Sequence, residues 1–252
     1  MRELKVEAVI LDAKDIYDAD RSLLLFSREL GKVYVRARGV RKPTSRLTGN
    51  LLPYLPTQLE LVRTGDNLTV VQAQVLVRAG NSIYPENPLL YLKQVQGIAE
   101  ALNRLFIERE PHPAVYGGLI YVLERLRILY DQSGGEAKAR LLVTEYLLKC
   151  LVELGYRPQL DTCVATGLPL DPDFLAWSDK LGGTLSETGY RQMDAEGSRL
   201  SSKLTVVALR EFLKPAFSAE RLKVPQEIAE EAGVVARGYL QYQIGAPLRA
   251  FA

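Results

Sequence analysis

The chain has 252 residues, of which 47% are hydrophobic and 25% charged, and its formal net charge is only +2 at pH 7. This length and composition suit a globular protein of one or two domains with a buried core. They exclude a membrane-spanning helix, since no apolar run approaches the roughly 18 residues required. They also exclude a uniformly basic protein, so any affinity for polyanions must come from how the charge is distributed.

The first 80 residues are typical of short β-strands. Five segments rich in Val, Leu, Thr and Tyr are separated by turn-forming sequences. The predicted strands cover residues 6–11, 22–27, 32–40, 57–63 and 67–79. Five such strands without a long helix between them predict a small closed barrel, which also hides the sheet edges. The spacing does not fix the type of barrel, because an SH3-like barrel would give the same pattern.

Residues 80–88, GNSIYPENP, mark a predicted domain boundary. From Leu89 onward, apolar residues recur with a helical period. The predicted helices cover residues 89–106, 114–130, 136–155, 202–213 and 225–243. Residues 156–201 are rich in Gly, Pro, Asp, Ser and Thr, and we predict an irregular segment there. The expected fold is therefore α+β, with a barrel domain at residues 1–80 and a helical domain at residues 81–252.

The segment GKVYVRARGVRKPTSRL, residues 31–47, carries six basic side chains and no acidic one. Alternation along the strand places three of its cations and one tyrosine on the outer face of the barrel and its small apolar residues inside, and the other three cations continue into the loop that follows. Such a face can follow a phosphate backbone while the aromatic ring stacks on a base. The candidate DNA-binding residues of this segment are Lys32, Tyr34, Arg36, Arg38, Arg41, Lys42 and Arg46. A solvated basic strand that guards a sheet edge is the alternative interpretation.

Two more arginines and one acidic loop adjoin this segment. An oligonucleotide-binding (OB) barrel binds its ligand across strands two and three, between loops one-two and four-five. Arg21 and Arg63 would then lie near the same path. The first loop also carries four aspartates, Asp12, Asp15, Asp18 and Asp20. It lacks the glycine and the distal glutamate of a calcium loop, so we interpret it as a polar turn.

The sequence contains no recognisable catalytic or cofactor motif. Its single histidine, His112, argues against Ser–His and Cys–His catalysis, and no P-loop or dinucleotide-binding fingerprint is present. We therefore expect no enzymatic activity and no cofactor. Two cysteines are too few for a disulfide framework, and charges interrupt the first apolar run, which is unlike a signal peptide. We expect a cytoplasmic protein without a membrane partner.

The run DADRSLLLFSRELGKVYVRARGVRKPTSRLTGNLLPY resembles the N-terminal domain of the bacterial recombination mediator RecO. An acidic turn, a strand, LGK, a basic strand ending in ARG, and RKPxSRL occur there in this order. The tail YLQYQIGAPLR, residues 239–249, is similar to the closing helix of the family. The resemblance covers nearly the whole chain, and it is strongest over residues 6–80.

This resemblance implies an N-terminal five-stranded OB-type barrel followed by an all-helical domain. It implies a protein that binds single- and double-stranded DNA, anneals complementary strands, and works with RecR to load RecA onto DNA coated by single-strand-binding protein (SSB). For the SSB C-terminal tail, residues 124–130, Lys138 and Arg140 are candidates, and an ordinary solvent-facing helix is the alternative. Two other functions stay open: an RNA-binding module and a protein-docking module without annealing activity.

Many RecO proteins carry a zinc site, from which this sequence departs. The first C-x-x-C aligns with TCVATG, which gives Cys163 and Thr166, and the second aligns with GGTLSETG, which gives Ser186 and Gly189. One ligand of four remains, and a structural zinc site needs about four N or S donors. We therefore predict no metal in this degenerate zinc-ribbon-like insert, residues 156–201, and interpret Cys163 as an unreactive remnant.

Overall fold

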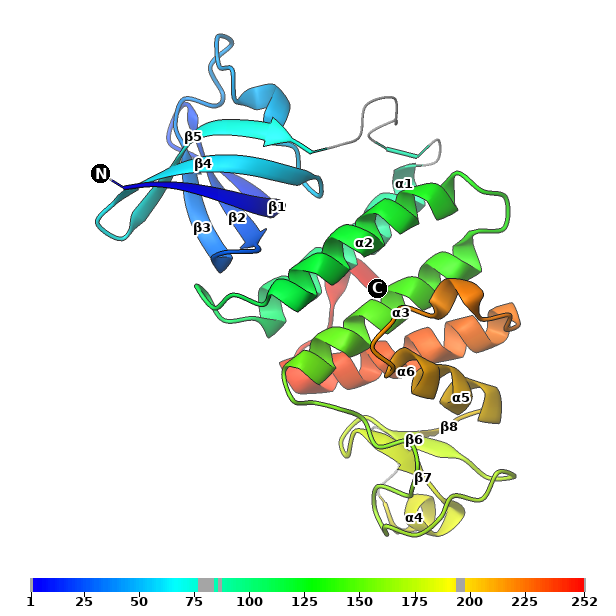
Figure 1. Ribbon diagram of the computed structural model, residues 1–252. Helices are drawn as coiled ribbons and strands as arrows, with labels where there is room; N and C mark the ends of the chain where they lie inside the picture. The colour runs from blue at the N-terminus through cyan, green and yellow to red at the C-terminus, as the bar shows by residue number, and fades with distance from the viewer. Residues whose placement is uncertain (1, 77–83, 86–87, 194–197, 252) are drawn as a thin grey trace. The chain divides into compact units, whose positions relative to one another are not determined.

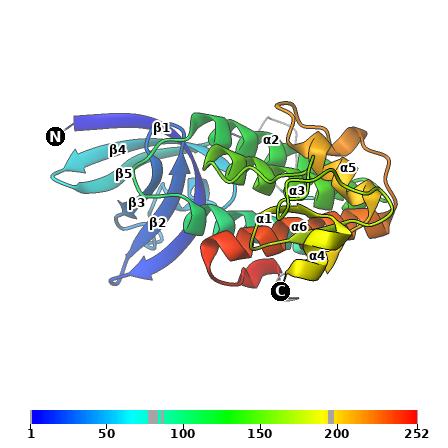
Figure 2. The ribbon, with the colours of Figure 1, turned by 90° about the horizontal axis from the view of Figure 1, so that it is seen from below.

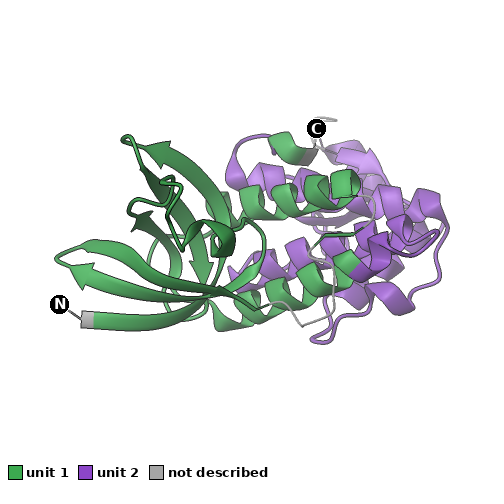
Figure 3. Cartoon of the chain, turned by 90° about the horizontal axis from the view of Figure 1, so that it is seen from above, with its two compact units in different colours: residues 1–127, 249–252 green, residues 128–248 purple. Residues whose placement is uncertain are grey.

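The computed structural model describes residues 2–76, 84–85, 88–193 and 198–251. The chain divides into two compact units (Figure 3). The first contains Met1–Arg127 and Arg249–Ala252, and the second contains Ile128–Leu248. The predicted domain boundary at residues 80–88 lies largely outside the described residues. In the part of the chain that is described, no helix is long and apolar enough to cross a membrane.

Five strands of the first unit form a closed barrel in the order β1-β2-β3-β5-β4 (Figure 1). They are β1 (Arg2–Ile16), β2 (Asp20–Ser27), β3 (Gly31–Ala37), β4 (Pro56–Thr64) and β5 (Asn67–Val75). Neighbouring strands are antiparallel except β3 and β5, which pair in parallel through Arg36 and Thr69. This Greek-key order is that of an OB barrel, so the expected fold class is confirmed and the SH3-like alternative is wrong. A short 3-10 helix, η1 (Thr48–Asn50), lies between β3 and β4.

The chain that follows the first helix completes the wall of the barrel beside β3. Glu108 forms an isolated bridge with Lys32, and the Arg109 N–H donates to the Lys32 carbonyl oxygen at 2.8 Å. The two backbones come so close at Gly31 that a Cβ atom there would lie 1.9 Å from the Glu110 carbonyl oxygen. Gly31 also has a φ of +66°, which a residue with a side chain rarely adopts. Glycine is therefore required at the start of β3.

The five predicted helices are confirmed, with ends that differ by one or two residues. They are α1 (Pro88–Leu105), α2 (Pro113–Tyr130), α3 (Glu136–Glu153), α5 (Lys203–Phe212) and α6 (Gln226–Ile244). In the second unit α3 packs along α6, and α5 packs against both (Figures 1 and 2). Two 3-10 helices, η2 (Ala219–Arg221) and η3 (Arg249–Phe251), follow α5 and α6 in the chain.

Residues 156–201, which we call the ribbon segment, are more regular than predicted. They contain a three-stranded sheet in the order β7-β6-β8 and a short helix. Its elements are β6 (Ala176–Ser178), β7 (Gly183–Leu185), α4 (Glu187–Gln192) and β8 (Ser198–Leu200). The sequence did not reveal this small sheet, because strands of three residues are too short to give an alternating pattern.

An aromatic contact and a hydrogen bond from an ion-paired arginine join the ribbon segment to α6. The Trp177 and Tyr239 rings meet edge to face with centroids 5.8 Å apart, and the indole N–H of Trp177 donates to Asp179 at 2.7 Å. Arg199 pairs with the same carboxylate and donates to the Val234 carbonyl oxygen of α6 at 3.1 Å. Both partners of this ion pair therefore have further hydrogen bonds, as a buried charge requires.

Candidate nucleic-acid interface

The predicted DNA-binding surface is the outer face of β2 and β3. The side chains of β3 alternate as predicted, with Val33, Val35 and Ala37 buried in the core of the barrel. Antiparallel pairing arranges the outer face in three rows, which are Phe26 with Lys32, Leu24 with Tyr34, and Ser22 with Arg36. The rows differ in what covers them.

Protein covers the row of Phe26 and Lys32. The Phe26 ring meets the Phe106 ring edge to face, with centroids 5.4 Å apart. The Nζ atom of Lys32 donates a hydrogen bond to the Asn103 carbonyl oxygen at 2.6 Å. Burial lowers the pKa of Lys32, although the charge of Glu108 opposes this shift. Lys32 points out of the barrel as predicted, but its ammonium group is bound within the protein.

The β1–β2 turn, residues 17–19, folds over the row of Ser22 and Arg36. The Arg36 Nε and Nη2 atoms contact Asp20 Oδ2 at 2.7 and 2.6 Å. The second oxygen of Asp20 accepts the Gly39 N–H at 2.7 Å. The Arg36 guanidinium lies 4.7 Å from the centroid of the Tyr17 ring, which is 76% exposed. The Gly39 hydrogen bond and the Arg36 guanidinium together lower the pKa of Asp20.

Asp15 forms a second cluster with two arginines of the predicted site. Arg21 Nε donates to Asp15 Oδ1 at 2.7 Å, and Arg41 Nε lies 3.3 Å from Asp15 Oδ2. Arg41 also donates its backbone N–H to the Ala19 carbonyl oxygen at 3.0 Å and a side-chain N–H to that of Asp18 at 3.3 Å. The hydrogen bond from Arg21 and the charge of Arg41 lower the pKa of Asp15. The acidic loop is thus the ion-pair partner of the basic segment.

Three cations of the basic segment remain exposed. The side chains of Arg38, Lys42 and Arg46 form no ion pair or hydrogen bond with any residue that the structure describes. Arg38 follows β3 directly, and the other two belong to the loop that leads to η1. Tyr34, on the outer face of β3, is 49% exposed. These four side chains are the part of the predicted surface that is open to a ligand.

Alternation places Arg21 and Arg63 on a different face from Arg36. Arg63, next to the last residue of β4, is in phase with Leu59 and Leu61, whose side chains face the core of the barrel. Arg21 is likewise in phase with Leu23 and Leu25 of β2, whose side chains also face the core of the barrel. The structure therefore does not bring these two arginines onto the outer face of β3.

Sequence reasoning missed Lys14 and the role of Tyr17. Lys14 pairs with Ser22, which pairs with Arg36, so the side chains of Lys14 and Arg36 belong to one row of the outer face. A bulge in β1 between Ile10 and Asp12 sets this register, and the sequence gives no sign of it. Tyr17 has a φ of +52°, in a turn that alternation cannot describe. Only the coordinates show that its ring lies beside Arg36.

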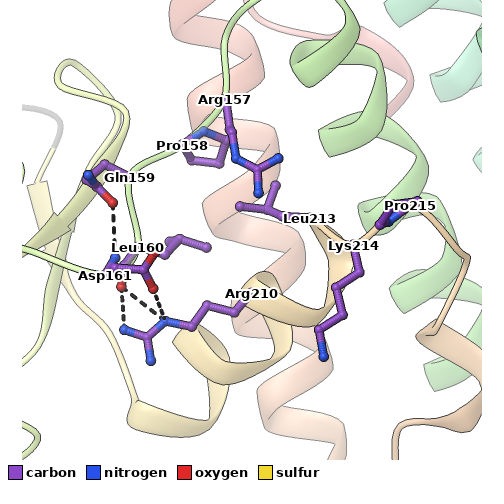
Figure 4. A pocket seen from close by; sticks show the side chains of 9 residues that line it. All are labelled: Arg157, Pro158, Gln159, Leu160, Asp161, Arg210, Leu213, Lys214 and Pro215. Carbon is purple, nitrogen blue, oxygen red and sulfur yellow. Dashed lines mark hydrogen bonds and ion pairs between the residues drawn. The ribbon is translucent and has the colours of Figure 1, made fainter.

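A separate pocket of about 520 Å³ lies in the second unit, between the start of the ribbon segment and the end of α5 (Figure 4). Its walls combine cations with apolar side chains, and no aromatic residue lines it. The lining residues are Arg157, Pro158, Gln159, Leu160, Asp161, Arg210, Leu213, Lys214 and Pro215. Arg210 is held by the Leu160 carbonyl oxygen and by Asp161, each 3.1–3.2 Å from its Nε atom. The side chain of Arg157 has no polar partner among the described residues.

The chain matches the family described as Recombination protein O N terminal over residues 1–79 and the one described as Recombination protein O C terminal over residues 95–250. The second match covers more than half of the chain. The chain belongs to the RecO family. The DNA repair protein RecO of Pelotomaculum thermopropionicum is 29% identical over 256 residues, which cover 100% of this chain and 93% of that protein.

Two further members of the RecO family give a similar result. The DNA repair protein RecO of Desulforudis audaxviator is 30% identical over 225 residues, covering 89% of this chain and 84% of that protein. The DNA repair protein RecO of Geobacter sulfurreducens is 29% identical over 254 residues, which cover 100% of this chain and 97% of that protein. These relatives place the chain in a family of DNA repair proteins along its whole length.

The four positions that align with RecO zinc ligands do come together in the ribbon segment. Cys163 accepts hydrogen bonds from the side chains and backbone N–H groups of Thr166 and Ser186, and a Cβ atom at Gly189 would lie 2.5 Å from its sulfur. Burial opposes ionisation of the thiol, but these hydrogen bonds lower its pKa to about 6. One sulfur and two hydroxyls do not fit a structural zinc ion. Among the described residues, no group of three or more His, Cys, Asp and Glu side chains could hold a metal.

Proposed function

We propose that this protein is a cytoplasmic recombination mediator that binds single- and double-stranded DNA and anneals complementary strands. In this proposal it helps to load RecA onto SSB-coated DNA, with RecR as a further partner. The observation that carries the proposal is the open part of the predicted surface, where Tyr34 of β3 and three exposed cations of the chain that follows β3 belong to an OB barrel. Barrels of this type bind oligonucleotides across strands two and three.

The proposed contact uses Tyr34 for stacking and Arg38, Lys42 and Arg46 for the phosphates. Base–aromatic stacking tolerates any sequence, which suits a protein that must act along the chromosome. Neutralised phosphates reduce the repulsion between two strands, so annealing needs no catalytic group. Lys32 is not part of this contact, because its ammonium group is bound to a carbonyl oxygen of the protein.

A salt titration of single-strand binding tests the number of contacts. Each phosphate contact contributes about −0.7 to the log–log slope, so three contacts predict a slope of about −2, and six would give about −4. Binding of labelled oligo(dT) is measured over a range of salt concentrations. A slope near zero would contradict the proposal and favour a protein-docking module. An RNA oligonucleotide that competes more strongly than DNA of the same sequence would favour an RNA-binding module.

Charge reversal tests the position of the contact. A triple variant with Arg38→Glu, Lys42→Glu and Arg46→Glu should lose about a hundredfold in affinity at 0.1 M salt, since three contacts disappear. The matched control reverses three exposed cations of the second unit, Lys180, Lys203 and Lys223, and changes the net charge equally. If both variants lose affinity to the same extent, the protein binds DNA through its overall charge and not through this face.

For the acidic C-terminal tail of SSB, we propose the pocket shown in Figure 4 as the binding site. A peptide with a terminal carboxylate needs apolar walls beside a cation, and the pocket provides Leu160, Leu213 and the guanidinium of Arg157. The absence of aromatic lining residues favours a peptide over a nucleotide base. Of the residues predicted from sequence, Arg140 is already paired with Glu230 at 3.2 Å, whereas Lys138 is exposed.

Two single variants compare these sites. Arg157→Glu should weaken binding of a synthetic SSB tail peptide by about tenfold or more, since a hydrogen bond to a charged group contributes about 1.5 kcal/mol or more. Lys138→Glu should have little effect, and it serves as the control with the same change of charge. If Lys138→Glu weakens peptide binding and Arg157→Glu does not, the tail binds at the helical surface around Lys138 that the sequence predicted.

A further inference from the structure

The two strands that flank the β1–β2 turn supply the basic segment with its own anions, Asp15 near the end of β1 and Asp20 at the start of β2. A carboxylate and a phosphate both accept two parallel hydrogen bonds from a guanidinium, so they compete for the same arginine. Asp20 binds two nitrogens of Arg36 through one oxygen, and Asp15 lies between Arg21 and Arg41. Three of the guanidinium groups predicted to meet DNA are therefore occupied by protein carboxylates.

Asp20 is also tied to the loop that follows β3. Its other oxygen accepts the Gly39 N–H at 2.7 Å, and Arg41 donates its backbone N–H to Ala19 in the same turn. The Tyr17 ring lies beside the Arg36 guanidinium. The turn and the loop thus hold each other across the outer face of the barrel. Among the described residues, no backbone N–H donates to the Asp15 carboxylate.

We propose that Asp20 and Asp15 are internal competitors of the DNA backbone, so that phosphates reach Arg36 and Arg41 only by displacing a carboxylate. This inference rests on the proposed DNA-binding function and adds Arg36 and Arg41 to its contacts. Partly exposed ion pairs contribute only about 0–1 kcal/mol, so a phosphate can replace the carboxylate at small cost. The exchange weakens DNA binding and makes release easier, which suits a protein that must leave the annealed duplex.

The experiment compares three Asp→Asn variants in the full chain, each with one negative charge fewer. Asp20→Asn keeps an oxygen for the Gly39 N–H and loses the charge that holds Arg36. Asp15→Asn releases Arg41. It tests the competition between carboxylate and phosphate at a carboxylate that accepts no backbone hydrogen bond from a described residue. Asp18→Asn is the matched control, since the Asp18 carboxylate contacts no cation among the described residues.

Oligo(dT) affinity is measured at several salt concentrations, with thermal unfolding to show that each variant is folded. Asp20→Asn and Asp15→Asn should each steepen the salt slope by about 0.7 for every guanidinium that then meets a phosphate. At 0.1 M salt, one such contact corresponds to about fivefold tighter binding. Asp18→Asn should leave the slope unchanged. Adding Arg36→Gln to Asp20→Asn should remove the gain, because the released cation is then absent.

Two outcomes would overturn the inference, and they are distinguishable. If the wild-type protein binds with a slope of about −2 and all three Asp→Asn variants behave alike, the carboxylates do not compete with DNA, while the proposed function stands. If the wild-type protein shows no salt-dependent binding and the Arg38, Lys42 and Arg46 reversal has no effect, the proposed function fails and takes the inference with it.

Discussion

In the barrel, alternation along each strand decides which way a polar side chain points, whereas in the ribbon segment three positions, from a turn and from the start of α4, converge on the sulfur atom of Cys163. On β3 the side chains of Tyr34 and Arg36 face outward because those of Val33, Val35 and Ala37 are buried. Around Cys163, by contrast, Thr166, Ser186 and Gly189 meet through backbone turns. The difference shows that a repeating pattern fixes the face of a residue, and that tertiary structure fixes its partners.

Gly31→Ala should produce the largest effect in the barrel. The new Cβ atom would lie 1.9 Å from the Glu110 carbonyl oxygen, and the residue has a φ of +66°. Left-handed strain of about 1–2 kcal/mol and overpacking of about 1–3 kcal/mol predict a loss of about 2–5 kcal/mol in the free energy of unfolding. Denaturant unfolding measures this loss.

Gly65→Ala is the control for Gly31→Ala. Gly65 has a φ of +62° but no atom within 4 Å of an added Cβ, so only the strain of about 1–2 kcal/mol applies. If the two variants lose the same stability, the backbone contact between β3 and residues 108–110 does not hold the barrel together.

Arg36→Glu and Lys42→Glu should separate folding from binding on the outer face of β3. Arg36→Glu places a carboxylate against Asp20, and we expect it to lower the free energy of unfolding by about 1–2 kcal/mol. Lys42→Glu alters an exposed side chain without an ion pair to a described residue, so its effect should stay within about 0.5 kcal/mol. Both variants should bind DNA less tightly. Equal stability of the two variants would show that the Arg36–Asp20 pair contributes nothing to the fold.

The sequence predicted the outward face of β3 and the five long helices because both follow a period of two or 3.6 residues. It could not predict that Asp20 binds Arg36, since that pair depends on a turn with a positive φ at Tyr17. Nor could it predict that Asn103 and Glu108 contact Lys32, because both lie more than 70 residues from it in the chain. The strand pattern therefore predicts which way a cationic side chain points, but only the tertiary structure shows whether another part of the protein covers it.

Gly189→Ala tests the convergence on Cys163 in the ribbon segment. The added Cβ atom would lie 2.5 Å from the sulfur and 3.4 Å from the Ala165 Cβ, so we expect a loss of about 1–3 kcal/mol from overpacking. Combining it with Cys163→Ala removes the sulfur that the new methyl group meets. The double variant should then be more stable than the sum of the two single changes predicts. Additive losses, measured by denaturant unfolding, would show that the two positions do not touch.

Titration of the two cysteines provides the finest test of the same site. Burial raises the pKa of Cys150 to about 12, whereas the hydrogen bonds from Ser186 and Thr166 lower that of Cys163 to about 6 despite its burial. Because the folded pKa of Cys163 lies below its ordinary value of 9.0, the thiolate contributes stability that is fully present above that value and disappears as the pH falls through about 6. The free energy of unfolding should therefore rise with pH between these two values.

The ultraviolet absorbance of the thiolate reports the Cys163 titration directly. A step near pH 6 should disappear in Cys163→Ala and persist in Cys150→Ala. Ser186→Ala should move the step to higher pH, because the thiolate loses a hydrogen-bond donor. A midpoint near 9 in the wild-type protein would mean that the hydroxyl and N–H groups do not point at the sulfur. The ribbon segment would then be held by packing alone, around Ala176 and Leu185, and the polar groups around Cys163 would contribute nothing to its stability.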